Sequence, residues 1–291
     1  GTRWTAEVEQ GFSFMPTNRL IPHSDFGEDV DETAQLNEFW GLSLEPFEVH
    51  DFGKEQFVGM ADETGRSTTV SASVSGGASG ITYFGSGRVQ DLDGIYGMED
   101  LGEARDKNQR ISGTANLNIF PNDRIRVQLR TNYTKTDQQA PEDANSIFAP
   151  FPLLFHSQPK LANENNLTGS PAFATVREGM QRTFGENVEH FGGSSQLTYS
   201  PSSSVNVNVT VGADISSQTS EANVPFAWDV DNFTTSDVLG DRDIAAVTSN
   251  VFTLEMRGGW EAAFGDWSSS FTGGGQGFLK ETDTRGGTGS I

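Results

Sequence analysis

The sequence predicts an all-β protein whose antiparallel strands are connected as hairpins, with long loops, as in a transmembrane β-barrel. Three features predict this: alternating apolar and polar residues, short links within strand pairs, and long polar excursions between pairs. The alternation is clearest in SVNVNVTVGADI (204–215), where every second residue from Val205 to Val211 is valine. Successive side chains of a strand point to opposite faces, so this segment separates an apolar environment from a polar one.

Alternation alone leaves two architectures open. In a soluble sandwich the apolar face belongs to the core, whereas in an outer-membrane barrel the apolar face meets lipid and the polar face lines the lumen. We expect the valines of this segment to meet lipid or a protein partner, and Asn206 and Asn208 to face a wet side. The order of short turn, strand pair and long excursion favours the barrel.

Expected strands recur along the whole chain, roughly eight to ten in number. Most are hairpin neighbours joined by a few turn residues, such as AlaSerGly at 78–80 and ProAsn at 121–122. The predicted strands cover residues 4–14, 68–77, 81–91, 110–120, 123–136, 194–200, 204–215, 249–264 and 266–281.

Long irregular segments separate the strand pairs, and they are too long for an ordinary compact sandwich. One contains a helix candidate at 170–185, in which Ser170 can cap the helix, Pro171 takes the first position and Gly185 ends it. We expect residues 1–291 to form a single barrel-type segment without a plug domain or signal peptide. The long segments cover residues 15–67, 137–190 and 216–247.

Composition excludes several classes of function. The formal net charge of -21 argues against nucleic acid as a partner and against a polybasic membrane surface. The absence of cysteine excludes disulfides, thiolate catalysis and cysteine-based zinc sites. The sequence contains no run of about 18 apolar residues, so no transmembrane helix is predicted. Only 34% of the residues are hydrophobic and 33 are glycine, which suits a large curved sheet with one wet face.

Two runs, residues 71–97 and 109–137, resemble TonB-dependent outer-membrane transporters, within them the branch of glycan-uptake receptors. A weaker likeness covers QLTYSPSSSVNVNVTVGADISS (196–217). The first run resembles the family in a glycine-ended strand, an aromatic strand and an aspartate–glycine stretch, and the second in an arginine-led strand and a strand ending Tyr-Thr. The matching residues are Ser75, Gly76, Gly77, Tyr83, Phe84, Asp91, Gly94, Arg110, Ser112, Asn116, Leu117, Tyr133 and Thr134.

The resemblance implies part of an outer-membrane receptor that takes up a bulky nutrient. It also implies a TonB-type energiser, acting through an N-terminal part that this chain lacks, and a surface lipoprotein as partners. The family barrel has 22 strands, more than twice what this chain supplies, and the family's plug domain is not expected within residues 1–291. The alternative is a truncated, repurposed relative, a non-catalytic structural subunit of a larger membrane complex, located in the periplasm.

No catalytic or cofactor-binding residues are predicted, and the chain is expected not to be an enzyme. No nucleophile elbow, zinc-protease or phosphate-loop motif occurs, and Gly85, Ser86 and Gly87 are expected to belong to a strand. The histidines are expected to be isolated loop residues. A metal site stays open: acidic segments could hold calcium through oxygen ligands, although solvated loops are the default. The four histidines are His23, His50, His156 and His190, and the acidic segments are 25–32, 229–232 and 237–243.

Aromatic residues in the long loops are expected to pack the loops against one another; the alternative is that they stack on sugar rings. The arginine-bearing face of the strand at 123–136 is expected to line the lumen or to be solvated. The aromatics are Trp40, Phe148, Phe151, Phe155 and Trp228, and the arginines are Arg124, Arg126 and Arg130.

Overall fold

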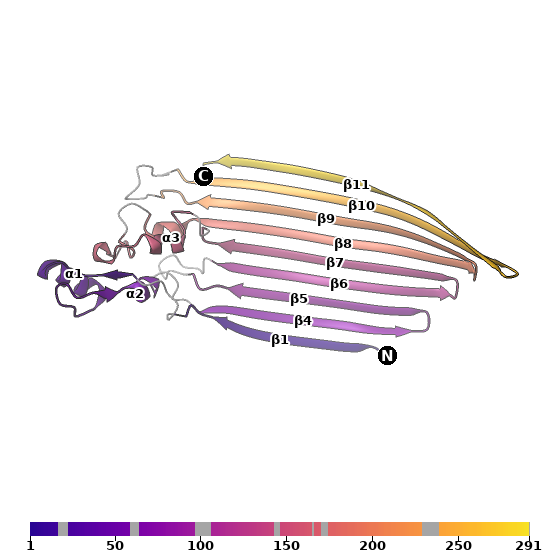
Figure 1. The fold of residues 1–291 in the computed structure, drawn as a ribbon, viewed down its shortest axis with the longest axis horizontal. Helices are drawn as coiled ribbons and strands as arrows, with labels where there is room; N and C mark the ends of the chain where they lie inside the picture. Colours follow the sequence, from indigo (N-terminus) through magenta and orange to yellow (C-terminus); the bar gives the residue numbers. More distant parts are fainter. Residues whose placement is uncertain are drawn as a thin grey trace.

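The computed structural model is dominated by one sheet of nine antiparallel strands, arranged side by side in a single curved layer (Figure 1). The order in the sheet follows the order in the chain, and the predicted all-β, hairpin-connected fold is confirmed. The structure describes residues 1–16, 23–58, 64–96, 106–142, 146–164, 166–169, 174–228 and 239–290. The nine strands are β1 (Arg3–Ser13), β4 (Gly65–Ala78), β5 (Ile81–Asp93), β6 (Lys107–Asn122), β7 (Ile125–Ala140), β8 (Thr183–Ser202), β9 (Val205–Val224), β10 (Asp241–Phe264) and β11 (Trp267–Gly289).

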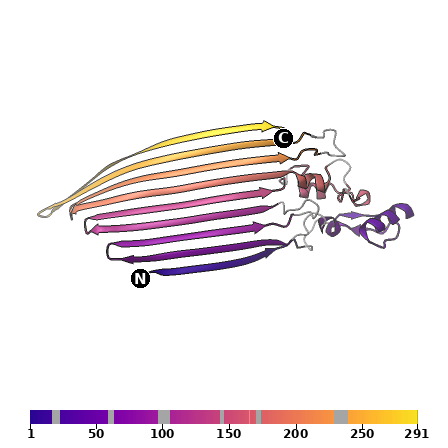
Figure 2. The same cartoon turned by 180° about the vertical axis from the view of Figure 1, so that it is seen from behind.

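The sheet is open, because within the described residues β1 and β11 each pair with a neighbour on one side only. The short hairpin turns lie at one end of the sheet, and the long connections gather at the other (Figures 1 and 2). The long connections hold small elements: β2 (Ser24–Asp25), α1 (Val30–Trp40), β3 (His50–Asp51), α2 (Gly53–Val58), α3 (Pro150–Phe155), the 3₁₀ turn η3 (Pro159–Leu161) and α4 (Val176–Gln181). We call these elements together the cap.

The strands near the C-terminus are longer than predicted. β8 already begins at Thr183, β9 runs on to Val224 and β10 begins at Asp241, so the ends of the segments 137–190 and 216–247 are strand and not irregular loop. Neither face of these extensions is consistently apolar, and SSQTSEAN at 216–223 is polar on both faces. Without an apolar face the extensions show no alternation, and only their pairing with neighbouring strands identifies them.

The turn between β6 and β7 also differs from the prediction. It consists of Asp123 and Arg124, whereas ProAsn at 121–122 still belongs to β6. The register shifts between Ile119 and Asn122, which is a local irregularity of the bulge type. Proline has no N–H to give to the ladder and is therefore placed at such irregular positions.

The helix candidate at 170–185 is wrong in length and in its caps. The helix α4 spans Val176–Gln181, and Gly185 lies in β8. Thr175 is the N-cap: its Oγ1 accepts a hydrogen bond from Glu178 N (3.2 Å), and the Glu178 carboxylate accepts one from Thr175 N (2.6 Å). This capping box fixes the start of the helix. Ser170 and Pro171 lie outside the described residues.

The two faces of the sheet are chemically opposite. In one row across three strands, Leu197, Val209 and Met256 are directly paired. In the adjacent row, on the other face, Thr198 is paired with Asn208, which is paired with Arg257. Alternation therefore runs in phase from strand to strand, giving one apolar and one polar face.

Neither face of the sheet contributes a buried apolar core. The apolar face leaves large side chains open; Val211, for example, is 47% exposed. Within the described residues, the buried hydrophobic side chains all lie in the cap segments and in the connection after β9. They are Leu36, Phe52, Ala149, Leu153, Leu154, Ala174, Met180 and Trp228.

We predict that Thr175→Ala destabilises the cap by about 1 kcal/mol, because the capping box loses its hydroxyl acceptor. Thr175→Ser keeps that acceptor and should lose much less. Hydrogen exchange of the α4 amides in the two variants measures the difference. Equal loss of protection in both would show that the methyl group, and not the cap, matters.

Candidate functional site

The candidate site is the polar face of the sheet, together with the cap at its loop end. Side chains on this face bond across the strands. Asn118 Nδ2 donates to Thr82 Oγ1 (3.0 Å), and Gln128 Nε2 donates to Asn118 Oδ1 (3.0 Å). Thr198 Oγ1 donates to Asn208 Oδ1 (2.8 Å). Hydrogen-bond networks of this kind hold the polar side chains in defined positions on this face.

The arginines predicted to be solvated are exposed. Arg126 and Arg130 lie on the polar face of β7, and Arg124 belongs to the turn. The Arg126 guanidinium lies 5.1 Å from the centre of the Phe120 ring, a cation–π contact. Within the described residues, none of these three arginines has an ion-pair partner. The polar face therefore carries positive charge without a paired carboxylate near its turn end.

The cap is assembled from segments that are far apart in the sequence. Trp40 Nε1 donates to the Pro159 carbonyl (3.2 Å), and Lys160 N donates to Asp25 Oδ2 (3.1 Å). Gln56 is buried and its Nε2 donates to the Thr168 carbonyl at 3.4 Å. These bonds join the segment between β1 and β4 to the segment between β7 and β8.

A second contact joins α4 to the connection after β9. Trp228 Nε1 donates to the Glu178 carbonyl (3.0 Å), and the Trp228 ring meets Phe148 edge-on, with centroids 5.3 Å apart. The Arg182 guanidinium lies over both rings, at 4.5 Å from Phe148 and 5.3 Å from Trp228. Arg182 Nε also pairs with a carboxylate oxygen of Glu142 at 3.1 Å.

The expectation that loop aromatics pack the loops together is confirmed for Trp40, Phe148 and Trp228. Trp40 contacts the ring of the buried Phe52 at 5.6 Å between centroids. Phe155 behaves differently, because its side chain is 59% exposed. The side chain of Phe151 lies outside the described residues.

The histidines are not all loop residues. His190 lies in β8, where its Nε2 is 2.9 Å from Asp214 Oδ2, and His50 lies in β3, 3.3 Å from Glu55 Oε1. His23 Nδ1 is 3.0 Å from Ser157 Oγ, and burial lowers the pKa of His23. His156 lies just after α3. Each of the first three therefore has a partner in the fold.

The acidic segment 25–32 uses its carboxylates within the cap. Asp29 caps α1 by accepting from Asp31 N and Glu32 N, both at 2.9 Å, and Glu32 Oε2 accepts from Glu28 N at 3.0 Å. Asp25 accepts from Lys160 N, as described above. Within the described ranges, no three or more His, Asp or Glu side chains gather in a way that could hold a metal ion. Residues 229–232, 237 and 238 lie outside those ranges.

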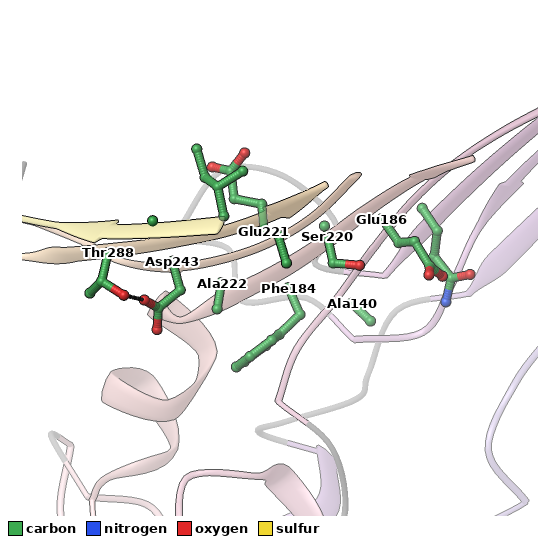
Figure 3. A pocket seen from close by; sticks show the side chains of 13 residues that line it. Ala140, Phe184, Glu186, Ser220, Glu221, Ala222, Asp243 and Thr288 are labelled. Carbon is green, nitrogen blue, oxygen red and sulfur yellow. Dashed lines mark hydrogen bonds between the residues drawn. The ribbon is translucent and has the colours of Figure 1, made fainter. Parts of the chain in front are cut away.

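The polar face has a hollow of about 520 Å³ at the loop ends of β7 to β11 (Figure 3). Phe184, Ala222 and Asp243 are paired in one row and point to the same side of the sheet. Glu186 and Ser220 form the next row on that face. Glu221 points to the opposite face, where its carboxylate pairs with Arg242 at 2.8 Å. The alternation in the sequence did not indicate this hollow, because neither face of its strand extensions is consistently apolar or consistently polar.

The base of the connection between β5 and β6 is closed by Asp106. Its Oδ2 accepts from Ile95 N (3.1 Å) and its Oδ1 from Tyr96 N (3.0 Å), while Gly94 N donates to its carbonyl (2.7 Å). Burial raises the pKa of Asp106, which outweighs the opposing effect of these bonds. Burial also raises the pKa of Tyr96 to about 12, and the nearby Asp106 charge contributes.

The fold is similar to that of solved chains of a peptide transporter. Two of these chains come from structures of the RagAB peptide importer in its closed-closed and open-open states. Each alignment covers 99% of this chain with a TM-score of 0.62, and the sequence identities are 12% and 14%, respectively. A third structure of the RagAB peptide transporter matches equally well, at 13% identity. This chain spans 35–39% of the length of those chains. At this identity the likeness shows the fold.

No protein-family model matches the sequence, and neither does any curated protein. Among the helices that the structure describes, none is both long enough and apolar enough to cross a membrane.

We predict that Asp106 makes stability depend on pH. The pKa of Asp106 in the folded protein lies above the unfolded value of about 4. The protonated side chain therefore adds to the free energy of unfolding below the unfolded pKa, and this contribution is lost as pH rises through the folded pKa. Asp106→Asn should remove this part of the pH dependence. Thermal unfolding between pH 4 and pH 8 measures it, with Asp123→Asn in the exposed turn as the control. An unchanged pH profile in Asp106→Asn would contradict the assignment.

Proposed function

We propose that this chain is part of an outer-membrane, TonB-dependent receptor that takes up a bulky nutrient of the peptide class. The fold likeness to peptide-importer chains over 99% of this chain supports the transporter role. The peptide class comes from what those structures are said to import. The proposed role requires no catalytic residue, so we propose that the chain is not an enzyme.

The height of the apolar band on β9 is the observation that carries this proposal. On the valine face the residues are apolar from Val205 through Ile215, and polar from Ser217 onward. Ten residue steps at about 3.3 Å span roughly 33 Å along the strand. At the usual barrel tilt of about 40° this corresponds to a band roughly 25 Å tall, the height of the lipid-facing band in outer-membrane barrels.

Both borders of the band have the side chains expected at a membrane surface. At the loop-end border Tyr133 pairs with Phe191, and the next row on the same face holds Lys135 and Glu189, whose charged groups are 2.7 Å apart. At the turn-end border Trp260 stacks on Phe271, with ring centroids 5.8 Å apart. Aromatic girdles flank the apolar band of outer-membrane barrels in this way.

The proposal includes the partners and the location that the resemblance implied. A TonB-type energiser would act through another part of the transporter, and a surface lipoprotein would meet the cap end. The outer membrane is the proposed location. An open sheet cannot lie in lipid by itself, because its edge strands would leave N–H and C=O groups without partners. Further strands must therefore pair with the edges β1 and β11.

The open edges also favour a second candidate function, an accessory structural subunit of a periplasmic or membrane complex. In that case another protein would cover the apolar face and the strand edges. The two functions differ in what keeps the protein dispersed. A lipid-facing band requires detergent, whereas a covered subunit requires its protein partner. A folded, monodisperse chain purified without either would contradict both.

We predict that Val209→Arg lowers the free energy of unfolding in lipid vesicles by about 2 to 4 kcal/mol, because Val209 lies near the middle of the apolar band. Thr210→Arg is the matched control, since Thr210 lies on the polar face and is paired with Glu255. It should change stability far less. Denaturant titration of both variants measures the difference. Equal costs in the two would contradict lipid contact on the valine face.

We also predict that cells depend on this protein to accumulate labelled peptides. Deleting its gene should abolish the uptake, and dissipating the membrane energy that drives TonB-type systems should do the same in the wild type. Normal peptide uptake in the deletion strain would contradict the receptor role and leave the structural subunit as the better candidate.

A further inference from the structure

The hollow at the loop end of the polar face is acidic and lacks positive charge of its own. Glu186 and Asp243 lie on the polar face, two strands and one row of side chains apart, which places their backbones about 12 Å apart. None of the 13 residues that line the hollow is Lys, Arg or His. The nearby Arg242 lies on the opposite face and is paired with Glu221. The two carboxylates are therefore not neutralised by their surroundings.

Each of these carboxylates is held in place by one hydrogen bond. Gln218 Nε2 donates to Glu186 Oε1 at 2.5 Å, and Thr288 Oγ1 donates to Asp243 Oδ1 (Figure 3). Within the described residues the second oxygen of each carboxylate accepts no hydrogen bond. One carboxylate oxygen of Glu186 and one of Asp243 thus remain available as hydrogen-bond acceptors. The surface around them is largely apolar and includes Phe184, Ala222 and Ala245.

We propose that this hollow binds the cationic side chains of a peptide substrate, with Glu186 and Asp243 as the groups that contact the ammonium or guanidinium ions. Carboxylates bind these ions through charge-assisted hydrogen bonds, which are stronger than neutral ones. An acidic recess also concentrates cations from solution. The aliphatic stems of lysine and arginine would lie against Phe184, since such stems bury well on apolar surface. This inference rests on the proposed peptide uptake and specifies its substrate class.

The spacing of the carboxylates fits an extended peptide with cations at alternate positions. Side chains on the same side of an extended peptide are about 7 Å apart. Two flexible lysine stems can span the remaining few ångströms to carboxylates whose backbones lie about 12 Å apart. By contrast, the exposed arginines of β7 lie toward the turn end, away from this hollow.

The test compares three pentapeptides of equal length: Ala-Lys-Ala-Lys-Ala, Ala-Gln-Ala-Gln-Ala and Ala-Glu-Ala-Glu-Ala. Their affinities for the intact protein, purified in detergent, are measured by calorimetry at low and at physiological salt. The lysine peptide should bind at least about tenfold more tightly than the glutamine peptide, since a hydrogen bond to a charged group contributes that much or more. The difference should shrink as salt rises.

The double variant Glu186→Gln, Asp243→Asn should lose the preference for the lysine peptide and keep its affinity for the glutamine peptide. Glu221→Gln is the control, because Glu221 lies on β9, the strand between those of Glu186 and Asp243, and its carboxylate is on the opposite face of the sheet. It should leave the preference intact. A circular dichroism spectrum like that of the wild type verifies that each variant is folded.

The outcomes separate this inference from the proposed function. Equal binding of all three peptides, or a preference for the glutamate peptide, overturns the inference and leaves peptide uptake standing. A lysine preference that survives in the double variant also overturns it, because the charge would then be recognised elsewhere. Failure of every peptide to bind overturns both.

Discussion

The opposite chemistry of the two faces of the nine-stranded sheet is the constraint on which the rest of the structure depends. A shift of one residue in the pairing of any strand would exchange its two faces. The ladder prevents this, because β8 and β9 are paired from Thr183 and Asn223 down to Ser202 and Val205. The same register brings together the hydrogen-bonded side chains of the polar face, the Lys135–Glu189 ion pair and the residues that line the hollow.

A sheet built in this way gains its stability differently from a globular core. Its apolar side chains stay open, and its described buried hydrophobic side chains lie in and around the cap. There, Trp40, Phe52 and Leu36 anchor one end, while Trp228, Phe148 and Arg182 hold the other. The cap is thus a small folded unit made of segments more than a hundred residues apart, placed over the loop ends of the strands. The protein thus combines a sheet that keeps one apolar and one polar face from strand to strand with a cap that has its own buried residues.

Sequence patterns predicted the strands where one face is apolar, because only there does a period of two appear. They failed at the loop ends of β8, β9 and β10, where neither face is consistently apolar and only pairing with the neighbouring strands identifies the extended chain. The helix α4 was placed too early because Ser170 and Pro171 form a good starting signal, whereas the structure uses Thr175 with Glu178. Within residues 15–67 the helix α1 was missed, although Asp29, Glu32 and Gly41 are recognisable cap residues.

The sequence by itself determined the all-β class, the hairpin connections and the segregation of valines from asparagines, because each depends on neighbours within a few positions. The tertiary structure alone decided which rows of side chains meet across strands and how the loops assemble into a cap. It also decided that Glu186 and Asp243 share one hollow while Glu221 lies behind the sheet. These last features join residues tens of positions apart, and their placement depends on the register of three strands at once, which no local pattern encodes.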